Sequence, residues 1–139
     1  MTDRAQLNRA VVEEFRANGG RVGGQFGDTP LLLLTTTGAR SGEARTWPLT
    51  YIRDGDVLVV AAANGGRAAL PGWYHNLRAD PRGTVEVGTE VFTVLAAEAA
   101  GAERARLWAA FGAARPIIAE LQGRTERTIP LITLTRRTG

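Results

Sequence analysis

The sequence predicts a mainly β protein with some helix: a small antiparallel barrel of about six strands, with an N-terminal helix and further helices packed on it. Short apolar runs are joined by two hairpin turns, Asp54-Gly55 and Gly88-Thr89, whereas strand–helix–strand alternation is sparse. The chain has no GxGxxG motif and no lysine for a Walker loop, which disfavours a parallel nucleotide-binding fold. Barrels of this type often hold a flat ligand in a groove at one rim.

The first element predicted is a helix over residues 3–17. Leu7, Val11 and Phe15 repeat at helical spacing, Asp3 can cap the start, and Asn18-Gly19-Gly20 can end it. Residues 19–29 are rich in glycine and show no period, which indicates a loop that is either a plain linker or a lid over a site. We expect one domain over residues 1–139, with an N-terminal helix within residues 1–18 and a Gly-rich loop over 19–29.

The remaining elements follow in order along the chain. Strands are predicted where short apolar or alternating runs are bounded by turn residues: 31–37, 44–53, 57–63, 84–87, 90–97 and 129–135. Pro48 indicates that the second of these is an edge strand or carries a bulge. Helices are predicted over 72–79, over 102–114 with Leu107, Trp108 and Phe111 facing inward, and from Pro116 to about Gly123.

Composition excludes several classes of function. The chain has 139 residues, no cysteine and one histidine, His75, so disulfides, thiolate chemistry and a multi-histidine metal site are excluded and no metal is expected. No apolar run approaches the roughly 20 residues that span a bilayer, and we expect a cytoplasmic protein. All 17 basic residues are arginine and they are scattered along the chain, so no nucleic-acid partner is expected.

One turn carries most of the chemical information. Leu31 to Leu34 lead into a segment with two glycines, a serine hydroxyl and two guanidinium groups: Arg40, Ser41, Gly42 and Arg45 follow Gly38. Glycine lets backbone N–H groups approach a ligand, and each guanidinium can grip an oxyanion through a two-pronged contact. This pattern predicts a phosphate or carboxylate site, and the alternative is a hairpin turn with solvated arginines.

Four segments resemble a known family. They are Glu14 to Gly20 with Val22-Gly23-Gly24; Leu32 to Arg45; Gly65-Gly66 followed by Pro71, Trp73 to Leu77 and Asp80-Pro81; and Arg127-Thr128-Ile129-Pro130. In order and spacing these segments resemble the deazaflavin-dependent nitroreductases, the A-type branch of the flavin/deazaflavin oxidoreductases of actinobacteria. The similarity extends from about residue 8 to about residue 135.

The resemblance implies a split β-barrel of the FMN-binding type that binds coenzyme F-420, an 8-hydroxy-5-deazaflavin with a phosphate and oligoglutamate tail. FMN is the less favoured cofactor. The positions that carry over to the anionic tail are Arg40, Ser41, Gly42 and Arg45. Those expected along the ring are Val60, Ala61, Ala62, Ala63, Asn64, Gly65, Gly66, Pro71, Trp73 and Asn76. A structural role remains the alternative for Trp73, which can fill the core, and for Asn76, which can tie a loop.

The resemblance also implies hydride transfer from the reduced cofactor to an unsaturated acceptor, either a quinone or a nitro compound. No catalytic side chain is assigned, and Tyr74 is a weak candidate for protonating the acceptor. Other hypotheses are a deazaflavin carrier without turnover and an FMN-binding protein on the same barrel. Ala63 and Asn64 replace a serine and a lysine that family members often carry.

The segment before the last strand lacks the tyrosines that often line the family's substrate pocket. Ile117, Ile118 and Leu121 are expected to form an aliphatic wall there, which favours a quinone over a nitroimidazole, and the alternative is that they are core residues. The partners expected are a small-molecule acceptor and a second copy in a homodimer. The N-terminal helix carries arginines beside an apolar face, so peripheral membrane contact is considered, but packing against the barrel is favoured.

Overall fold

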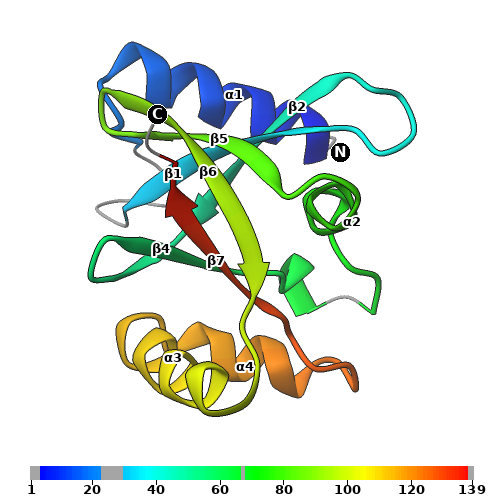
Figure 1. Ribbon diagram of the computed structural model, residues 1–139. Coiled ribbons are helices and arrows are strands. Elements are labelled where there is room, and N and C mark those ends of the chain that lie inside the picture. The colour runs from blue at the N-terminus through cyan, green and yellow to red at the C-terminus, as the bar shows by residue number, and fades with distance from the viewer. Residues whose placement is uncertain (1–3, 23–29, 67, 138–139) are drawn as a thin grey trace.

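The computed structural model describes residues 4–22, 30–66 and 68–137 and shows one curled sheet with helices around it (Figure 1). The helices are α1 (Arg4–Ala17), α2 (Gly72–Ala79), α3 (Gly101–Ala114) and α4 (Ile117–Gly123), and η2 (Asn64–Gly66) is a 3-10 turn. The strands are β1 (Leu31–Thr37), β2 (Ala44–Thr50), β3 (Ile52–Asp54), β4 (Val57–Ala61), β5 (Arg82–Val87), β6 (Glu90–Glu98) and β7 (Leu131–Arg136).

The sheet curls because its two edge strands are neighbours in sequence. Its seven described strands are ordered β2-β1-β5-β6-β7-β4-β3, and every pairing is antiparallel. Only Tyr51 separates β2 at one edge from β3 at the other, and two residues span at most about 7 Å. The edges therefore meet at Tyr51, and the sheet forms the split β-barrel that the sequence predicted.

The unbroken leucine run of β1 is explained by burial on both faces of the sheet. Leu32 and Leu34 point into the barrel core, whereas Leu31 and Leu33 face outward into a cluster with Phe15 of α1. Alternate residues of a strand point to opposite faces, so a strand covered on both sides reads as continuously apolar. This packing fixes the position of β1 and of the turn that follows it.

Helices α2, α3 and α4 close the rest of the barrel. Trp73 and Leu77 of α2 pack into the interior core beside Val60 of β4. The outer face of β4, at Val59, packs instead against α3 and α4, which lie together at one end of the molecule (Figure 1). Helix α2 thus contacts β1, while η2, which follows β4, contacts α4.

Most predicted elements are confirmed, and their boundaries differ for two physical reasons. The predicted strand 44–53 is two strands, since the chain passes from one sheet edge to the other at Tyr51, and this raises the number of described strands from about six to seven. The strands predicted over 57–63 and 129–135 end at Ala61 and begin at Leu131. Pro130 opposes Ala62 and has no N–H, so the ladder stops there.

The N-terminal helix is confirmed as α1, which packs on β1. Val12 and Phe15 are buried against the outer face of the sheet, and the Arg16 guanidinium donates two hydrogen bonds to the Glu86 carboxylate of β5, at 3.0 and 2.8 Å. The proposed cap at Asp3 and the loop residues 23–29 lie outside the described residues. Within the part of the chain that the structure describes, none of the helices has the length and apolarity needed to cross a bilayer.

Candidate functional site

Hydrogen bonds within the turn between β1 and β2, residues 38–43, fix its shape. The N–H of Gly38 donates to the carbonyl of Glu43 at 2.7 Å, and the N–H of Gly42 donates to the carbonyl of Gly38 at 2.9 Å. The Glu43 N–H donates to the Ser41 hydroxyl oxygen at 3.1 Å, which leaves the Ser41 O–H free to donate. A Cβ at position 38 would lie 2.6 Å from Ser41 Oγ, so a larger residue there would displace the serine hydroxyl.

A cavity of about 500 Å³ lies against this turn. It is lined by residues of the turn, of β2 and of the first half of α2: Gly38, Ala39, Arg40, Ser41, Arg45, Trp47, Gly72, His75 and Asn76. Three of the predicted tail residues, Arg40, Ser41 and Arg45, therefore lie together, and the described residues of this lining include no carboxylate. The N–H groups of Gly38, Ala39, Gly42 and Glu43 donate within the protein. The two exposed guanidinium groups and the Ser41 hydroxyl therefore make the donor set, and it suits an oxyanion.

Acidic side chains of the protein compete only weakly for the Arg45 guanidinium. Glu43 is the nearest acidic residue, and its carboxylate approaches the Arg45 guanidinium at 3.9 Å with the two side chains 75% and 60% exposed. An ion pair this long and this exposed contributes little. Arg45 therefore stays available to a stronger anion.

Asn76 ties the turn to α2. Its side-chain Oδ1 accepts a hydrogen bond from the Ala39 N–H at 3.0 Å, and its Nδ2 donates to the Thr36 hydroxyl at 3.0 Å. Asn76 is 8% exposed, so these bonds are made out of solvent. The structure thus supports the loop-tying role weighed from the sequence, and Asn76 holds the backbone of the turn in place beneath the cavity.

The second predicted segment, Val60 to Gly66, lies at the end of β4 and in η2. The side chain of Val60 points into the core and is fully buried. The carbonyls of Ala62 and Ala63 accept hydrogen bonds from the Arg127 guanidinium at 3.1 and 2.9 Å, and the Ala62 N–H is bonded to Pro130. These two carbonyls therefore have partners within the protein, and contact between this segment and the ring stays a prediction.

The α2 residues divide into those that line the cavity and those that do not. Pro71 precedes the helix, and its carbonyl accepts the Tyr74 N–H at 3.1 Å. Trp73 is 2% exposed within the barrel core, so it has almost no surface to offer a cofactor, and its burial favours the core role that was its alternative. His75 and Trp47 line the cavity, although no local pattern separated them from solvated or core residues.

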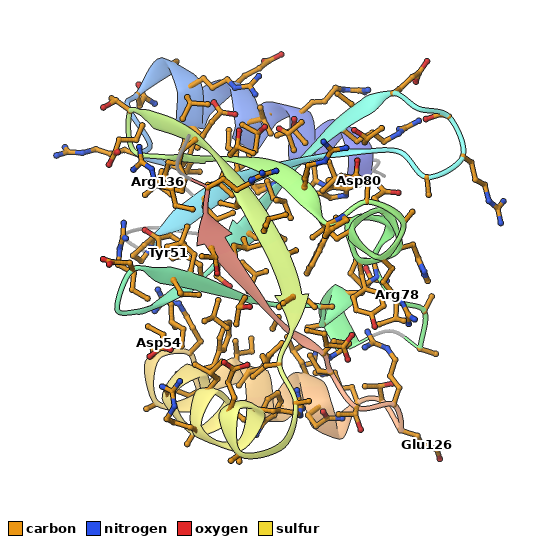
Figure 2. All side chains as sticks on the ribbon, in the orientation of Figure 1. Tyr51, Asp54, Arg78, Asp80, Glu126 and Arg136 are labelled. Carbon is orange, nitrogen blue, oxygen red and sulfur yellow. The ribbon has the colours of Figure 1, made fainter. Side chains whose placement is uncertain are left out.

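Tyr74 faces away from the tail cavity. Its hydroxyl donates to the Glu98 carboxylate at 2.5 Å, and Arg78 stacks over its ring at 5.9 Å, beside α2 in Figure 2. Burial, together with the bond to Glu98, raises the pKa of Tyr74 above its usual range. A phenol whose O–H is hydrogen-bonded to a carboxylate and whose pKa is raised is a poor proton donor.

The predicted aliphatic wall is not assembled as one surface. Ile118 is 3% exposed and packs in the core with Leu107 and Phe111, whereas Ile117 is 56% exposed. Leu121 is partly buried against the same core. Adjacent helical residues point about 100° apart, so Ile117 and Ile118 cannot share a face, and Ile118 is corrected to a core residue.

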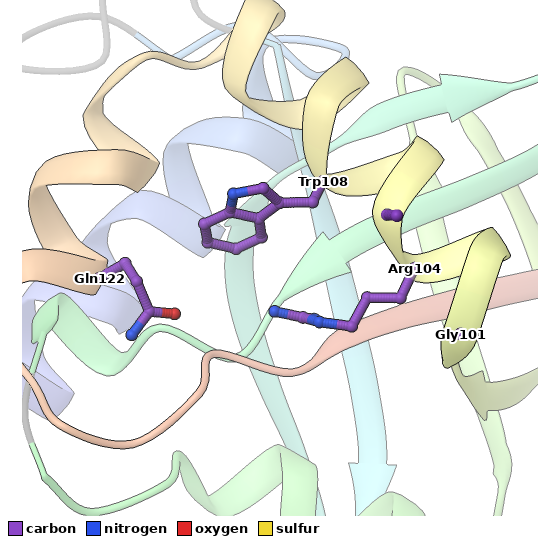
Figure 3. Close-up of a pocket in the computed structure, with 5 residues that line it drawn as sticks. Gly101, Arg104, Trp108 and Gln122 are labelled. Atoms are coloured by element: carbon purple, nitrogen blue, oxygen red, sulfur yellow. The ribbon is translucent and has the colours of Figure 1, made fainter.

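A second cavity, of about 340 Å³, lies against α3 (Figure 3). It is lined by Gly101, Arg104, Ala105, Trp108 and Gln122, with the Arg104 guanidinium 5.1 Å from the centre of the Trp108 ring. The Gln122 amide is bonded to backbone on both sides, to the Arg127 carbonyl and the Ile129 N–H. None of the predicted site residues lines this second cavity.

Comparison with known proteins agrees with this geometry. Residues 7–136 match the model of the F420H(2)-dependent quinone reductase family. The chain is 42% identical over 136 residues to the F420H(2)-dependent quinone reductase Rv1261c of Mycobacterium tuberculosis, covering 95% of this chain and 91% of that relative.

Two solved structures share the fold. The F420-H2-dependent reductase FDR-A is 37% identical with a TM-score of 0.70, covering 76% of this chain and 93% of its own. A chain solved as a domain-swapped dimer is 34% identical with a TM-score of 0.72, covering 88% and 93%. The similarity to deazaflavin-dependent reductases noted from the sequence is confirmed, and the chain belongs to the F420H(2)-dependent quinone reductase family.

Proposed function

We propose that a quinone is the acceptor of this F420-dependent reductase, and that the β1–β2 turn binds the anionic tail of the coenzyme. The proposed binding of the tail rests on the cavity of about 500 Å³, whose described lining has two exposed arginines and no carboxylate. This donor set fits a phosphate followed by glutamates. When bound, reduced coenzyme F420 supplies the hydride that the acceptor receives.

The residues of the chain act by binding and orientation. Arg40 and Arg45 grip tail oxygens, and the Ser41 hydroxyl donates to the same group. Asn76 fixes the Ala39 amide, so the turn is already shaped before the coenzyme arrives. A preformed site saves the free energy of ordering a loop on binding.

The ring is proposed to lie toward η2, beside the backbone of Ala61 to Gly66. The close relatives support a quinone acceptor, since the mycobacterial protein is named a quinone reductase. Reduction of a quinone to the quinol takes a hydride and a proton. We assign that proton to solvent, because the Tyr74 hydroxyl is bonded to Glu98 and its pKa is raised.

A homodimer and a cytoplasmic location complete the proposal. The relative solved as a domain-swapped dimer supports the former. Val91 and Leu95 are 64% and 40% exposed on β6, and they provide apolar surface for a second copy. Sedimentation at several concentrations tests the dimer, and a monomer at every concentration would remove it.

Steady-state oxidation of F420H2, followed through the absorbance of the oxidised coenzyme, tests the function. We expect turnover with a soluble quinone such as menadione, and slower turnover with a nitroimidazole. Faster turnover with the nitroimidazole would overturn the quinone proposal. Tight F420 binding without turnover on any acceptor would instead favour the carrier hypothesis.

A further inference from the structure

The guanidinium of Arg127 holds the segment that follows β4. Its Nη1 donates to the Ala62 carbonyl at 3.1 Å, and its Nη2 donates to the carbonyls of Ala63 at 2.9 Å and Ala69 at 3.4 Å. Arg127 lies 58 to 65 positions away from these residues in the sequence. One side chain therefore joins the strand end, the start of η2 and the far end of the loop.

The sequence explains why β4 needs such a group. Ala62 lies opposite Pro130, and its N–H donates to the Pro130 carbonyl at 2.9 Å. In an antiparallel pair the opposite residue returns a hydrogen bond, but proline has no N–H to give. The Ala62 carbonyl would lose its partner, and the Arg127 guanidinium takes the place of the missing donor.

The loop is fixed from a second side as well. Asn64 adopts a left-handed backbone (φ 49°), and its Nδ2 donates to the Ala69 carbonyl at 2.8 Å. Gly66 has φ +81°, and a Cβ there would lie 3.2 Å from the Leu121 carbonyl of α4. The turn is therefore held between Arg127 and α4, with asparagine and glycine at the two positions of positive φ, which both residues adopt readily.

Arg127 is itself held by α4. The Gln122 Nε2 donates to the Arg127 carbonyl at 2.7 Å, and the Gln122 Oε1 accepts the Ile129 N–H at 3.0 Å. The side-chain amide of Gln122 thus fixes the backbone at Arg127 and at Ile129. A guanidinium on a fixed backbone positions its acceptors more exactly than one on a mobile loop.

We propose that Arg127 is a positioning residue for coenzyme F420, which shapes residues 62–66 into the surface that receives the deazaflavin ring. This inference rests on the proposed function, because it takes the ring to lie beside that segment. The side chain donates to protein carbonyls and acts on the cofactor through the backbone that it holds. Loss of the Arg127 guanidinium is therefore expected to lower the affinity for the ring without changing how the protein binds the tail.

The test separates ring from tail with two ligands. Arg127→Gln and Arg127→Lys are titrated with F420 and with its riboflavin-level fragment, which keeps the ring and ribityl chain but lacks the phosphate and glutamates. We expect affinity for both ligands to fall by about tenfold or more in each variant. Lysine keeps the charge but not the two-pronged contact, so it should fold and still fail to restore binding.

A second measurement needs no cofactor. In the Arg127 variants without cofactor, amide hydrogen exchange should be faster than in the wild type in the peptide that contains Gly66. Exchange in the β1–β2 turn should stay unchanged. The matched control is Arg9→Gln, at an exposed arginine on α1, which should change neither exchange nor affinity.

The possible outcomes distinguish the positioning role of Arg127 from the proposed function of the protein. Fragment affinity within about twofold of the wild type in a folded Arg127 variant would overturn the proposal and leave Arg127 a structural residue. If Arg127→Gln does not fold, the Lys variant decides by the same criterion. A wild-type protein that binds neither ligand would instead refute the proposed function.

Discussion

Replacing Arg40 and Arg45 together by alanine tests the anion site directly. A charge-assisted hydrogen bond contributes about 1.5–3 kcal/mol net. Arg40 is exposed and the Arg45 side chain is 60% exposed, so solvent screening reduces each contribution to about 1 kcal/mol. The double substitution should therefore weaken F420 binding by about 2 kcal/mol, or about thirtyfold in Kd.

Fluorescence titration of the coenzyme gives the dissociation constants. The effect should shrink as salt is raised from about 0.05 to 0.5 M, because exposed charges are screened within about 10 Å or less. The riboflavin-level fragment should bind both proteins equally, since it has no tail. Arg9→Ala with Arg53→Ala is the matched control, because it removes two exposed arginines that do not line the cavity.

Neither arginine packs in the barrel core, so the thermal midpoint of the double variant should stay close to that of the wild type. An unchanged Kd for F420 in a folded double variant would refute the assignment of the turn. A loss equal to that of the control pair would show that only the overall charge matters.

Two further changes test side-chain contacts, one beside the site and one between β3 and α3. Asn76→Ala leaves the Ala39 N–H without its acceptor and the buried Thr36 hydroxyl without its donor, so urea denaturation should show a loss of about 1–3 kcal/mol together with weaker F420 binding; wild-type stability would contradict the role of this amide. The Arg106 guanidinium holds the pKa of Asp54 below its usual range, so its contribution is present above the unfolded pKa of about 3.9 and is lost as the pH falls through the folded value. Arg106→Gln should therefore lower the thermal midpoint slightly at pH 6 to 7 and not at about pH 2, and an equal loss at both would contradict the pairing.

Local signals in the sequence predicted most of the fold. Pro48 indicated an edge strand, and β2 is one. The break at Tyr51 was missed because no glycine or proline marks it: it arises where the sheet closes on itself, which is a property of the whole barrel. The strand ends near Ala62 and Pro130 depend on which residues face each other, and a single strand pattern does not contain that information.

The candidate site was predictable where chemistry is concentrated in one segment. Arg40, Ser41 and Arg45 lie within a few positions, and the fold brings them to one cavity. For Trp73 and Ile118 a ligand contact and a core position both stayed open, because an apolar side chain on a helix has the same pattern whether it faces a core or a pocket, and both are buried in the core. Arg127 belongs to a segment that carries the family resemblance, but its role was missed, since its acceptors lie some sixty positions earlier in the chain.

Binding of the cofactor itself is the most direct test of the central claim. The purified protein is titrated with coenzyme F420 and, separately, with FMN, each followed by its own fluorescence. The account predicts micromolar or tighter binding of F420 and much weaker binding of FMN, because the chain belongs to the F420H(2)-dependent quinone reductase family. Binding of FMN alone, or of neither ligand, would contradict it.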